Sequence, residues 1–278
     1  MIIDSHTHWG TSLWGDFTPQ YLLDIIEPVD FAICSNLEGI DSPVFKDESV
    51  CNEEMINVFK KYPKLKPLCV CQPNLSNNAD VVRDLLLKYP EFIGLKFHPE
   101  CMKLPANSDE YDEYLKLAKV FKKPCLYHSG HIKSRFSSPK LIYQKAKEFS
   151  DVPIILGHLS TGPKQSHVEA IEILVESIEN EDATLYVDTS WIDFAYEKLN
   201  ETMDDTLMLI EALKNTKKGD YTHRILWASD CPVGAFNQSS NDYKRNLEVF
   251  KTRVLERFND KTLLENLLCN NAKKLYNL

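Results

Sequence analysis

The chain has 278 residues, 43% of them apolar, and its formal charge of −9 comes from 41 acidic and 32 basic residues. This balance argues against a nucleic-acid partner, because binding to phosphates needs a basic face. No apolar run approaches the roughly 20 residues that span a bilayer, and the N-terminus lacks the pattern of a secretory signal. We therefore expect a cytoplasmic protein without a membrane or nucleic-acid partner, whose eight cysteines are reduced thiols of the core.

Short apolar runs recur along the whole chain and indicate β-strands. In chain order the predicted strands are Ile2–Ser5, Asp30–Ser35, Lys66–Gln72, Phe92–Phe97, Pro124–His128, Pro153–His158, Thr184–Asp188 and Arg224–Ser229. Runs that are apolar almost throughout suit parallel strands that are covered on both faces. Between them, apolar residues at three- and four-residue spacing predict helices at Asp80–Tyr89, Asp109–Phe121, Pro139–Phe149 and Val168–Glu179.

Alternation of strands and helices is typical of a parallel α/β sheet. The presence of eight such units favours closure of that sheet into a barrel. A (β/α)8 barrel needs roughly 250 residues. A doubly wound nucleotide-binding fold is disfavoured, because the chain has only nine glycines and no GxGxxG turn. A helical tail follows from about Asn241 to Tyr276. We predict a single domain over residues 1–278, a (β/α)8 TIM barrel of the α/β class with an additional C-terminal helix.

Most histidines fall at the carboxyl ends of the predicted strands, where TIM barrels carry their catalytic groups. The candidate groups at these ends are His6, His8, His98, His128, His131, His158 and Asp230. Alternate residues of a strand point to one face, so His6 and His8 can both aim into the barrel mouth. Each residue alone could be an ordinary core or capping residue. Together, neutral imidazoles and a carboxylate predict a site for Zn²⁺, Mn²⁺ or Fe²⁺.

Five segments carry a likeness to a known family: IIDSHTHWG at the start, GLKFHPE at 94–100, PCLYHSG at 124–130, PIILGHLSTG at 153–162 and ILWASDCP at 225–232. With these motifs in this order, the chain resembles the amidohydrolase superfamily, particularly its amidohydrolase-related (amidohydrolase 2) branch. The resemblance implies a TIM-barrel enzyme that uses a metal to hydrolyse amide, ester or lactone bonds. Some relatives in this branch instead decarboxylate or hydrate small acids.

The resemblance also implies roles for individual residues. The metal ligands that it implies are His6, His8, His128 and Asp230. His158 matches a sixth-strand histidine that either binds a second ion or orients water and polarises the substrate. Lys96 stands where some members carry a carbamylated lysine between two ions, but we expect it to pair with the acidic site or a substrate carboxylate. We therefore expect one divalent ion, preferably zinc, with Lys96 and His158 as ligands only if a second ion binds.

The leading hypothesis is hydrolysis of a small-molecule amide, ester or lactone by metal-activated water. Asp230 would accept the proton and His158 would steady the oxyanion. The alternative is a metal-dependent decarboxylase or hydratase of a small carboxylic acid, and a third is a barrel that binds a ligand without catalysis. The residues expected to contact the substrate are Lys96, His98, His131, Arg135 and Trp191. Aromatic residues that could line a pocket include Trp9, Trp14, Tyr127, Phe136 and Phe194. A homodimer is the default assembly.

Overall fold

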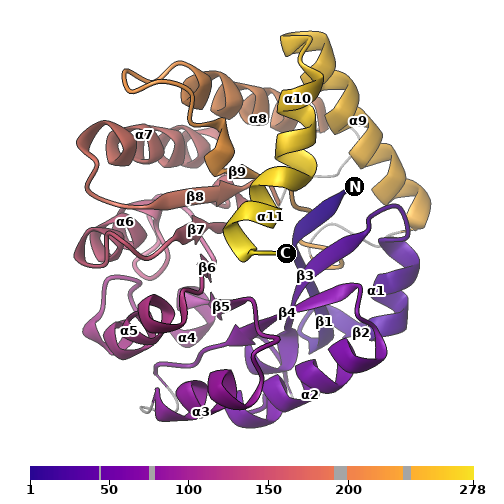
Figure 1. The fold of residues 1–278 in the computed structure, drawn as a ribbon, viewed down its shortest axis with the longest axis vertical. Coiled ribbons are helices and arrows are strands. Elements are labelled where there is room, and N and C mark those ends of the chain that lie inside the picture. Colours follow the sequence, from indigo (N-terminus) through magenta and orange to yellow (C-terminus); the bar gives the residue numbers. More distant parts are fainter. Residues whose placement is uncertain (44, 75–78, 191–198, 234–238) are drawn as a thin grey trace.

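The computed structural model describes residues 1–43, 45–74, 79–190, 199–233 and 239–278, with residues 199–202 described by their backbone alone. Parallel strands surround a central axis, and helices cover them on the outside (Figure 1). In sheet order these strands are β1 (Ile3–Ser12), β3 (Phe31–Asn36), β4 (Leu65–Val70), β5 (Gly94–Phe97), β6 (Cys125–Tyr127), β7 (Ile154–Leu156), β8 (Leu185–Asp188) and β9 (Ile225–Leu226). They correspond one to one with the eight predicted strands. A short antiparallel strand, β2 (Gly15–Phe17), pairs with the end of β1.

The sheet closes through backbone hydrogen bonds between β1 and the segment that follows β9. The Ser5 N–H donates to the Trp227 carbonyl at 3.1 Å, and the His8 N–H donates to the Cys231 carbonyl at 2.8 Å. The first strand therefore pairs with residues 227–231, and strand order follows chain order around the ring. The prediction of a TIM barrel is confirmed.

The described helices lie outside the sheet, except for the last, which covers one end of the barrel. They are α1 (Pro19–Ile25), α2 (Glu48–Lys61), α3 (Asp80–Lys88), α4 (Pro99–Met102), α5 (Asp112–Phe121), α6 (Pro139–Glu148), α7 (Lys164–Asn180), α8 (Leu199–Lys214), α9 (Ser240–Phe258), α10 (Lys261–Glu265) and α11 (Asn271–Tyr276). The four predicted helices correspond to α3, α5, α6 and α7. Helix α7 begins at Lys164 rather than Val168, because its first turn is polar and lies outside the apolar pattern. The predicted tail is α9 to α11, with a π-helical turn between the last two.

Local sequence signals fix several helix starts. The Thr18 hydroxyl accepts the Tyr21 backbone N–H at 3.2 Å, and Pro19 occupies the first position of α1. Ser239 and Asp242 form a reciprocal capping box at the start of α9. Such caps satisfy backbone N–H groups that have no partner inside the helix.

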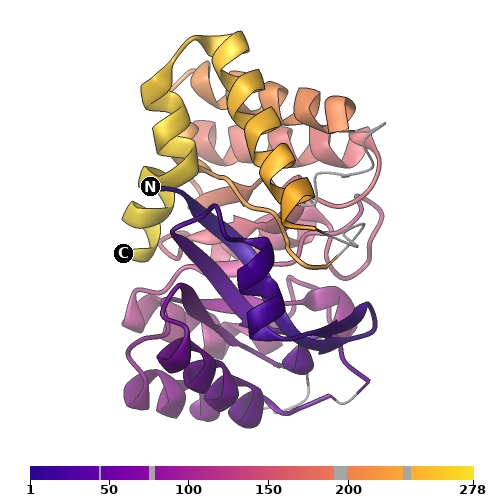
Figure 2. The same ribbon diagram turned by 90° about the vertical axis from the view of Figure 1, so that its right-hand side faces the viewer.

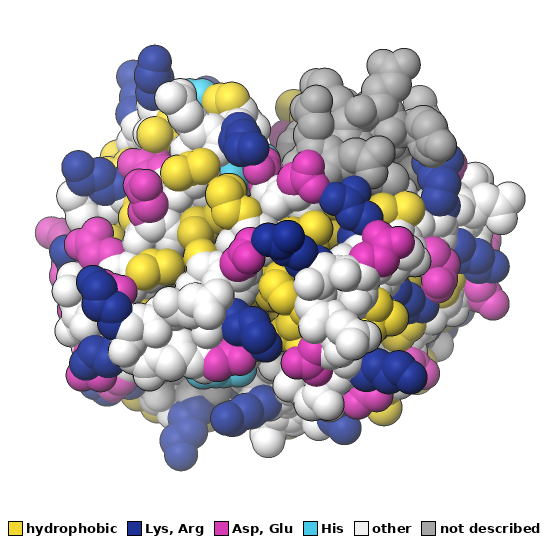
Figure 3. Space-filling view, turned by 90° about the horizontal axis from the view of Figure 1, so that it is seen from above, with side chains coloured by type: hydrophobic (Ala, Val, Ile, Leu, Met, Phe, Trp, Pro, Cys, Tyr) yellow, Lys and Arg dark blue, Asp and Glu magenta, His cyan; other side chains and the backbone are white. Residues whose placement is uncertain are grey.

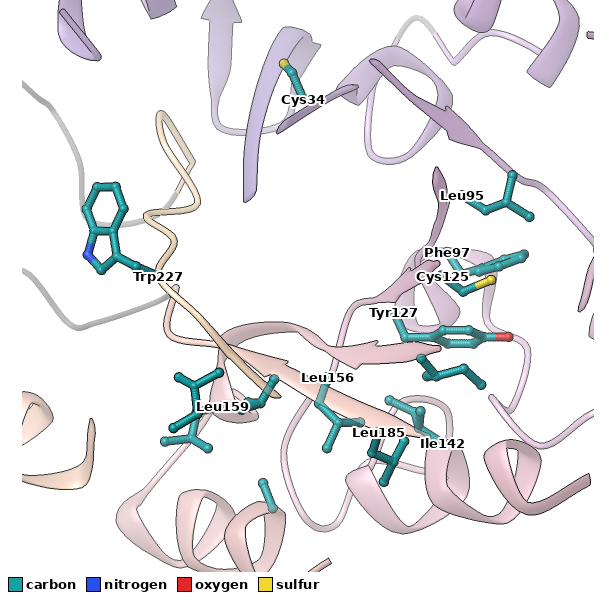
Figure 4. Packing of buried hydrophobic residues seen from close by; sticks show 14 of the residues in the cluster. Cys34, Leu95, Phe97, Cys125, Tyr127, Ile142, Leu156, Leu159, Leu185 and Trp227 are labelled. Carbon is teal, nitrogen blue, oxygen red and sulfur yellow. The ribbon is translucent and has the colours of Figure 1, made fainter. Parts of the chain in front are cut away.

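The apolar core has two layers, one outside the sheet and one inside the barrel. In the outer layer, Phe97 of β5 and Tyr127 of β6 lie side by side with ring centroids 4.7 Å apart, and Leu156 of β7 belongs to the same layer (Figure 4). The inner layer consists of Ile3, Ile33, Leu68, Leu126, Ile155 and Leu226. Ala272 and Tyr276 of α11 pack against it. Figures 1 and 2 place the C-terminus close to the N-terminus, so α11 covers the end of the barrel where the strands begin.

The surface agrees with the mixed charge of the sequence. On the face shown in Figure 3, acidic and basic side chains are interspersed among apolar and neutral ones. Among the described residues, no helix is both long enough and apolar enough to cross a membrane. The eight cysteines form no disulfide, and all but Cys101 are buried.

Candidate metal centre

The polar residues of the barrel continue the inward-facing positions of its strands. Leu126 of β6 belongs to the inner apolar layer, and His128 follows two residues later on the same face. On the neighbouring strand β5, Lys96 is paired in register with Leu126. The strands thus change from apolar to ionisable side chains as they approach their carboxyl ends.

Three side-chain atoms from opposite ends of the sequence converge at this level. His6 Nε2 and His8 Nε2 lie 3.1 Å apart. Asp230 Oδ1 lies 3.1 Å from His8 Nε2 and 3.5 Å from His6 Nε2. Ligand atoms at about 2.0–2.1 Å from a tetrahedral zinc ion are separated by roughly 3.3 Å. The spacing of these three atoms therefore fits one divalent ion.

Hydrogen bonds on the far side of each ring turn the Nε2 lone pairs toward this point. His6 Nδ1 lies 2.9 Å from Asp188 Oδ2, and His8 Nδ1 lies 2.9 Å from the hydroxyl of Ser35. Burial lowers the pKa of both histidines well below the usual range, so both rings are neutral. With protons on the Nδ1 atoms, the two unprotonated Nε2 atoms and the Asp230 carboxylate face one another. Such a donor set calls for a cation.

Lys96 brings a further nitrogen to the same place. Its Nζ lies 2.7 Å from His6 Nε2, and its side chain is buried. Burial lowers the pKa of Lys96 to about 8, and the charges of Asp230 and Asp188 oppose that shift. Lys96 therefore lies within reach both of the ligand atoms and of a substrate in the cavity.

His158 joins the centre to His128. Its Nε2 lies 3.1 Å from His128 Nδ1, and its Nδ1 lies 2.9 Å from the Ser190 hydroxyl and 4.0 Å from Asp230 Oδ2. The donor atoms of His6, His158 and Asp230 lie within 4.8 Å of one another, which makes a second, wider ligand set. We favour the set with His8, because its three atoms are only 3.1–3.5 Å apart.

Two of these residues have a backbone conformation that is unusual for residues other than glycine. His158 and Asp230 have φ angles of 69° and 60°. Such left-handed conformations cost free energy and tend to occur at functional sites. The Asp188 carboxylate helps to hold one of them, since it accepts the His158 backbone N–H at 2.8 Å.

His98 and His128 form the other side of the centre. Their rings are stacked, with centroids 4.0 Å apart and an interplanar angle of 12°. Burial lowers the pKa of His128 to about 3. The described side-chain contacts of His128 are with His98 and His158.

A cavity of about 350 Å³ opens above these residues, which is the size of a small-molecule site. Its described lining is His8, Trp14, Leu37, Ile40, Asp41, Lys96, His98, Cys101, His128, His158, Thr161, Asp230 and Val233. Two of the expected substrate contacts, Lys96 and His98, are among these. His131 and Arg135 are not, and Trp191 lies outside the described residues.

His131 and Arg135, which follow β6, have described contacts within their own loop. His131 Nδ1 accepts the Lys133 backbone N–H at 2.9 Å, and the exposed Arg135 lies over the Phe136 ring. Of the aromatic candidates, Trp14 lines the cavity, whereas Trp9 and Tyr127 are buried in the outer core.

Sequence reasoning missed the residues that orient the histidines. Asp188 bonds His6 and the His158 backbone, Ser190 bonds His158, and Ser35 bonds His8. A signal was present for one of them, because Asp188 ends β8 just as the candidate ligands end or follow their strands. Serine gives no comparable signal, since it is common in any loop.

The fold agrees with comparison to known proteins. The family model described as Amidohydrolase matches residues 3–278. The chain therefore belongs to the amidohydrolase family, as the sequence motifs predicted. A search of curated proteins finds no significant match.

Solved structures share the fold over almost the whole chain. A Pseudomonas putida protein assigned as a 2-pyrone-4,6-dicarboxylic acid hydrolase has 14% identity and a TM-score of 0.69, covering 99% of this chain and 97% of its own. A zinc-bound amidohydrolase from Burkholderia multivorans has 10% identity and a TM-score of 0.70, covering 100% and 99%. The 5-carboxyvanillate decarboxylase of Sphingomonas paucimobilis has 11% identity and a TM-score of 0.66, covering 100% and 99%. Identities this low show a common fold and leave the reaction open.

Proposed function

We propose that this chain is a metal-dependent hydrolase that acts on an amide, ester or lactone of a small molecule. The observation that carries the proposal is the convergence of His6 Nε2, His8 Nε2 and Asp230 Oδ1 within 3.1–3.5 Å of one another beside a cavity. His128 is proposed as a further ligand, and His158 and Lys96 as ligands of a second ion if one binds. The zinc in the Burkholderia multivorans structure supports zinc as the first choice, with manganese or iron as alternatives.

In this proposal, Asp230 and His158 have separate roles in hydrolysis. A divalent ion bound here would act as a Lewis acid and lower the pKa of a coordinated water to about 7. Asp230 directs Oδ1 to the two histidines and Oδ2 toward His158, so one carboxylate can hold the ion and also take up a proton. His158 lines the cavity and is held by Ser190, which places its neutral ring to stabilise charge on a substrate oxygen.

Decarboxylation or hydration of a small acid is the second candidate. The buried ammonium group of Lys96 at the cavity could hold a substrate carboxylate, and the Sphingomonas paucimobilis relative is named as a decarboxylase. Release of CO2 from a panel of aromatic and keto acids would favour this reaction. Hydrolysis of esters, lactones or amides without CO2 release would favour the first.

Elemental analysis of the purified protein tests the metal centre directly. Wild type should carry about one ion per chain, and the His6→Ala/His8→Ala variant should lose it because two of the converging nitrogens are gone. His223→Ala is the matched control, since this exposed histidine precedes β9 at the opposite end of the barrel. The metalloenzyme proposal fails if wild type binds no ion even after reconstitution. About two ions per chain would assign Lys96 and His158 to a second site.

Two further properties stay predictions from the sequence. A homodimer is expected to appear in light scattering at twice the mass of the chain. The cytoplasmic compartment can be tested by fractionation of the native cells.

A further inference from the structure

The cavity has two unlike ends. Its floor consists of ionisable residues carried by the strands or directly after them: His8, Lys96, His98, His128, His158 and Asp230. Its outer wall comes from connecting segments and is largely apolar: Trp14, Leu37, Ile40, Cys101 and Val233. Asp41 is the one carboxylate of the described outer wall. The cavity therefore combines an ionisable part carried by the strands with a largely apolar part that includes Asp41.

Asp41 is held in place by two separate segments. Its backbone N–H donates to the Leu37 carbonyl at 2.8 Å, and its carbonyl accepts the Leu13 N–H at 3.3 Å. The Trp14 indole N–H donates to its carboxylate. The backbone of Asp41 is thus held by the β1–β2 hairpin and by the loop after β3, and its carboxylate is held by Trp14.

The carboxylate keeps capacity for another donor. One indole N–H satisfies only part of a carboxylate, which can accept about four hydrogen bonds. Among the described lining residues the one ammonium group is that of Lys96, which lies 2.7 Å from His6 Nε2 at the floor. The outer wall therefore offers a negative charge that the described lining does not neutralise. The Trp14 side chain, 61% exposed, places a large aromatic ring beside it.

We propose that Trp14 and Asp41 form a specificity subsite for an ammonium group at the far end of the substrate. The ammonium would donate to the Asp41 carboxylate and contact the face of the Trp14 ring, which attracts cations. A second carboxylate at this end of a substrate would instead be repelled by Asp41.

Together with the proposed hydrolysis, on which this step rests, the subsite defines a substrate class: amides, esters or lactones whose acyl chain carries a distal amine. Hydrolysis adds water across the acyl C–N or C–O bond, with OH to the acyl carbon and H to the leaving nitrogen or oxygen. The acyl product is an amino acid, which also carries the released hydroxyl group when the substrate is a lactone, with its carboxylate at the floor and its ammonium group at Asp41.

Calorimetric binding of product-like probes tests the subsite without any need for turnover. The probes are 4-aminobutyrate, 5-aminopentanoate and 6-aminohexanoate, each compared with the alkanoate of the same chain length. Because both members of a pair carry the same carboxylate, the affinity ratio isolates the ammonium group. In the metal-loaded wild type, at least one ω-amino acid should bind about tenfold more tightly than its alkanoate. The ratio should fall to about one in Asp41→Asn and stay unchanged in Asp24→Asn, a control that removes an exposed carboxylate of α1.

A charge-reversal variant protects the test against simple loss of folding. Asp41→Lys should prefer adipate over hexanoate, a gain that an unfolded protein cannot show. A wild-type ratio near one, a ratio that survives in Asp41→Asn, or no binding of any ω-amino acid would each overturn the subsite. Failure of the hydrolytic proposal would look different: the ω-amino acids would bind in an Asp41-dependent way, while no ester, lactone or amide would be turned over.

Discussion

The two ends of the barrel are built from the same strands and have opposite chemistry. Where the strands begin, Ile155 and its neighbours form a dry layer that Tyr276 of α11 covers. Where they end, neutral imidazoles and Asp230 surround a cavity, and two residues there have left-handed backbone conformations. Side chains are buried at both ends, but only the burial of apolar side chains at the first end stabilises the fold. At the second end burial makes charge costly, which lowers the pKa of the histidines and raises that of Asp230 well above its usual range.

This contrast predicts that stability and activity can be altered separately, and Asp230→Asn should give the largest separation. Asn keeps the shape of the side chain but loses the oxygen that takes up the proton, so turnover should fall about 10²–10⁴-fold. The melting temperature should stay the same or rise, because a costly buried carboxylate has been removed. Both quantities should be measured on protein of known metal content. Full turnover in the metal-loaded variant would remove Asp230 from the mechanism.

Ile155→Ala tests the opposite end of the barrel. It leaves a cavity in the inner apolar layer, so the free energy of unfolding should drop by about 2–5 kcal/mol. Turnover of the folded protein at 25 °C should hardly change, since the residue does not line the active cavity. Urea denaturation and steady-state kinetics measure the two effects. A loss of activity beyond the loss of folded protein would show that the two ends are coupled.

Asp188→Asn should act between these extremes, on metal affinity. Its Oδ2 lies 2.9 Å from His6 Nδ1 and keeps the proton on that nitrogen, which makes Nε2 a better ligand. Loss of such a partner typically weakens metal binding about 10–100-fold, which competition with a chelator would measure. Asp182→Asn is the control, because Asp182 precedes the same strand at the other end of the barrel and bonds Tyr143. Equal metal affinity in the two variants would contradict the orienting role.

The fold was predictable because the barrel repeats one local signal, an apolar strand that ends in a polar group. The strand-end histidines follow from that rule without knowledge of any contact, whereas Lys96 was found through the family resemblance. The orientation of the histidine rings does not follow from this rule. Asp188 meets His6 only after the barrel has closed, and no spacing in the sequence records a pair 182 residues apart.

The direction of the loop after β6 could not be predicted from the sequence either. Arg135 is exposed, and the segment that carries it is held by Glu100, whose carboxylate accepts the Ser134 and Ser137 hydroxyls at 2.6 and 2.7 Å. Glu100 follows β5 and the serines follow β6, so this outcome depends on a contact between two loops. Such contacts decide which residues reach a cavity, and apolar periodicity does not encode them.

The smallest expected effect concerns His98, which combines a structural and a functional role in one ring. Its Nδ1 accepts the Cys101 backbone N–H at 3.2 Å and caps α4, so its proton lies on Nε2, and the ring lines the cavity. His98→Asn should keep the cap, because an Asn side chain accepts the same N–H, but it is too short to place a donor where Nε2 lies. On the substrate found in the screen, KM should rise about threefold to tenfold while the melting temperature stays constant. His98→Phe, which loses the cap as well, should lower both affinity and melting temperature. If both variants kept the wild-type KM, the donor role of His98 would be wrong, and if both kept the wild-type melting temperature, the cap would contribute nothing measurable.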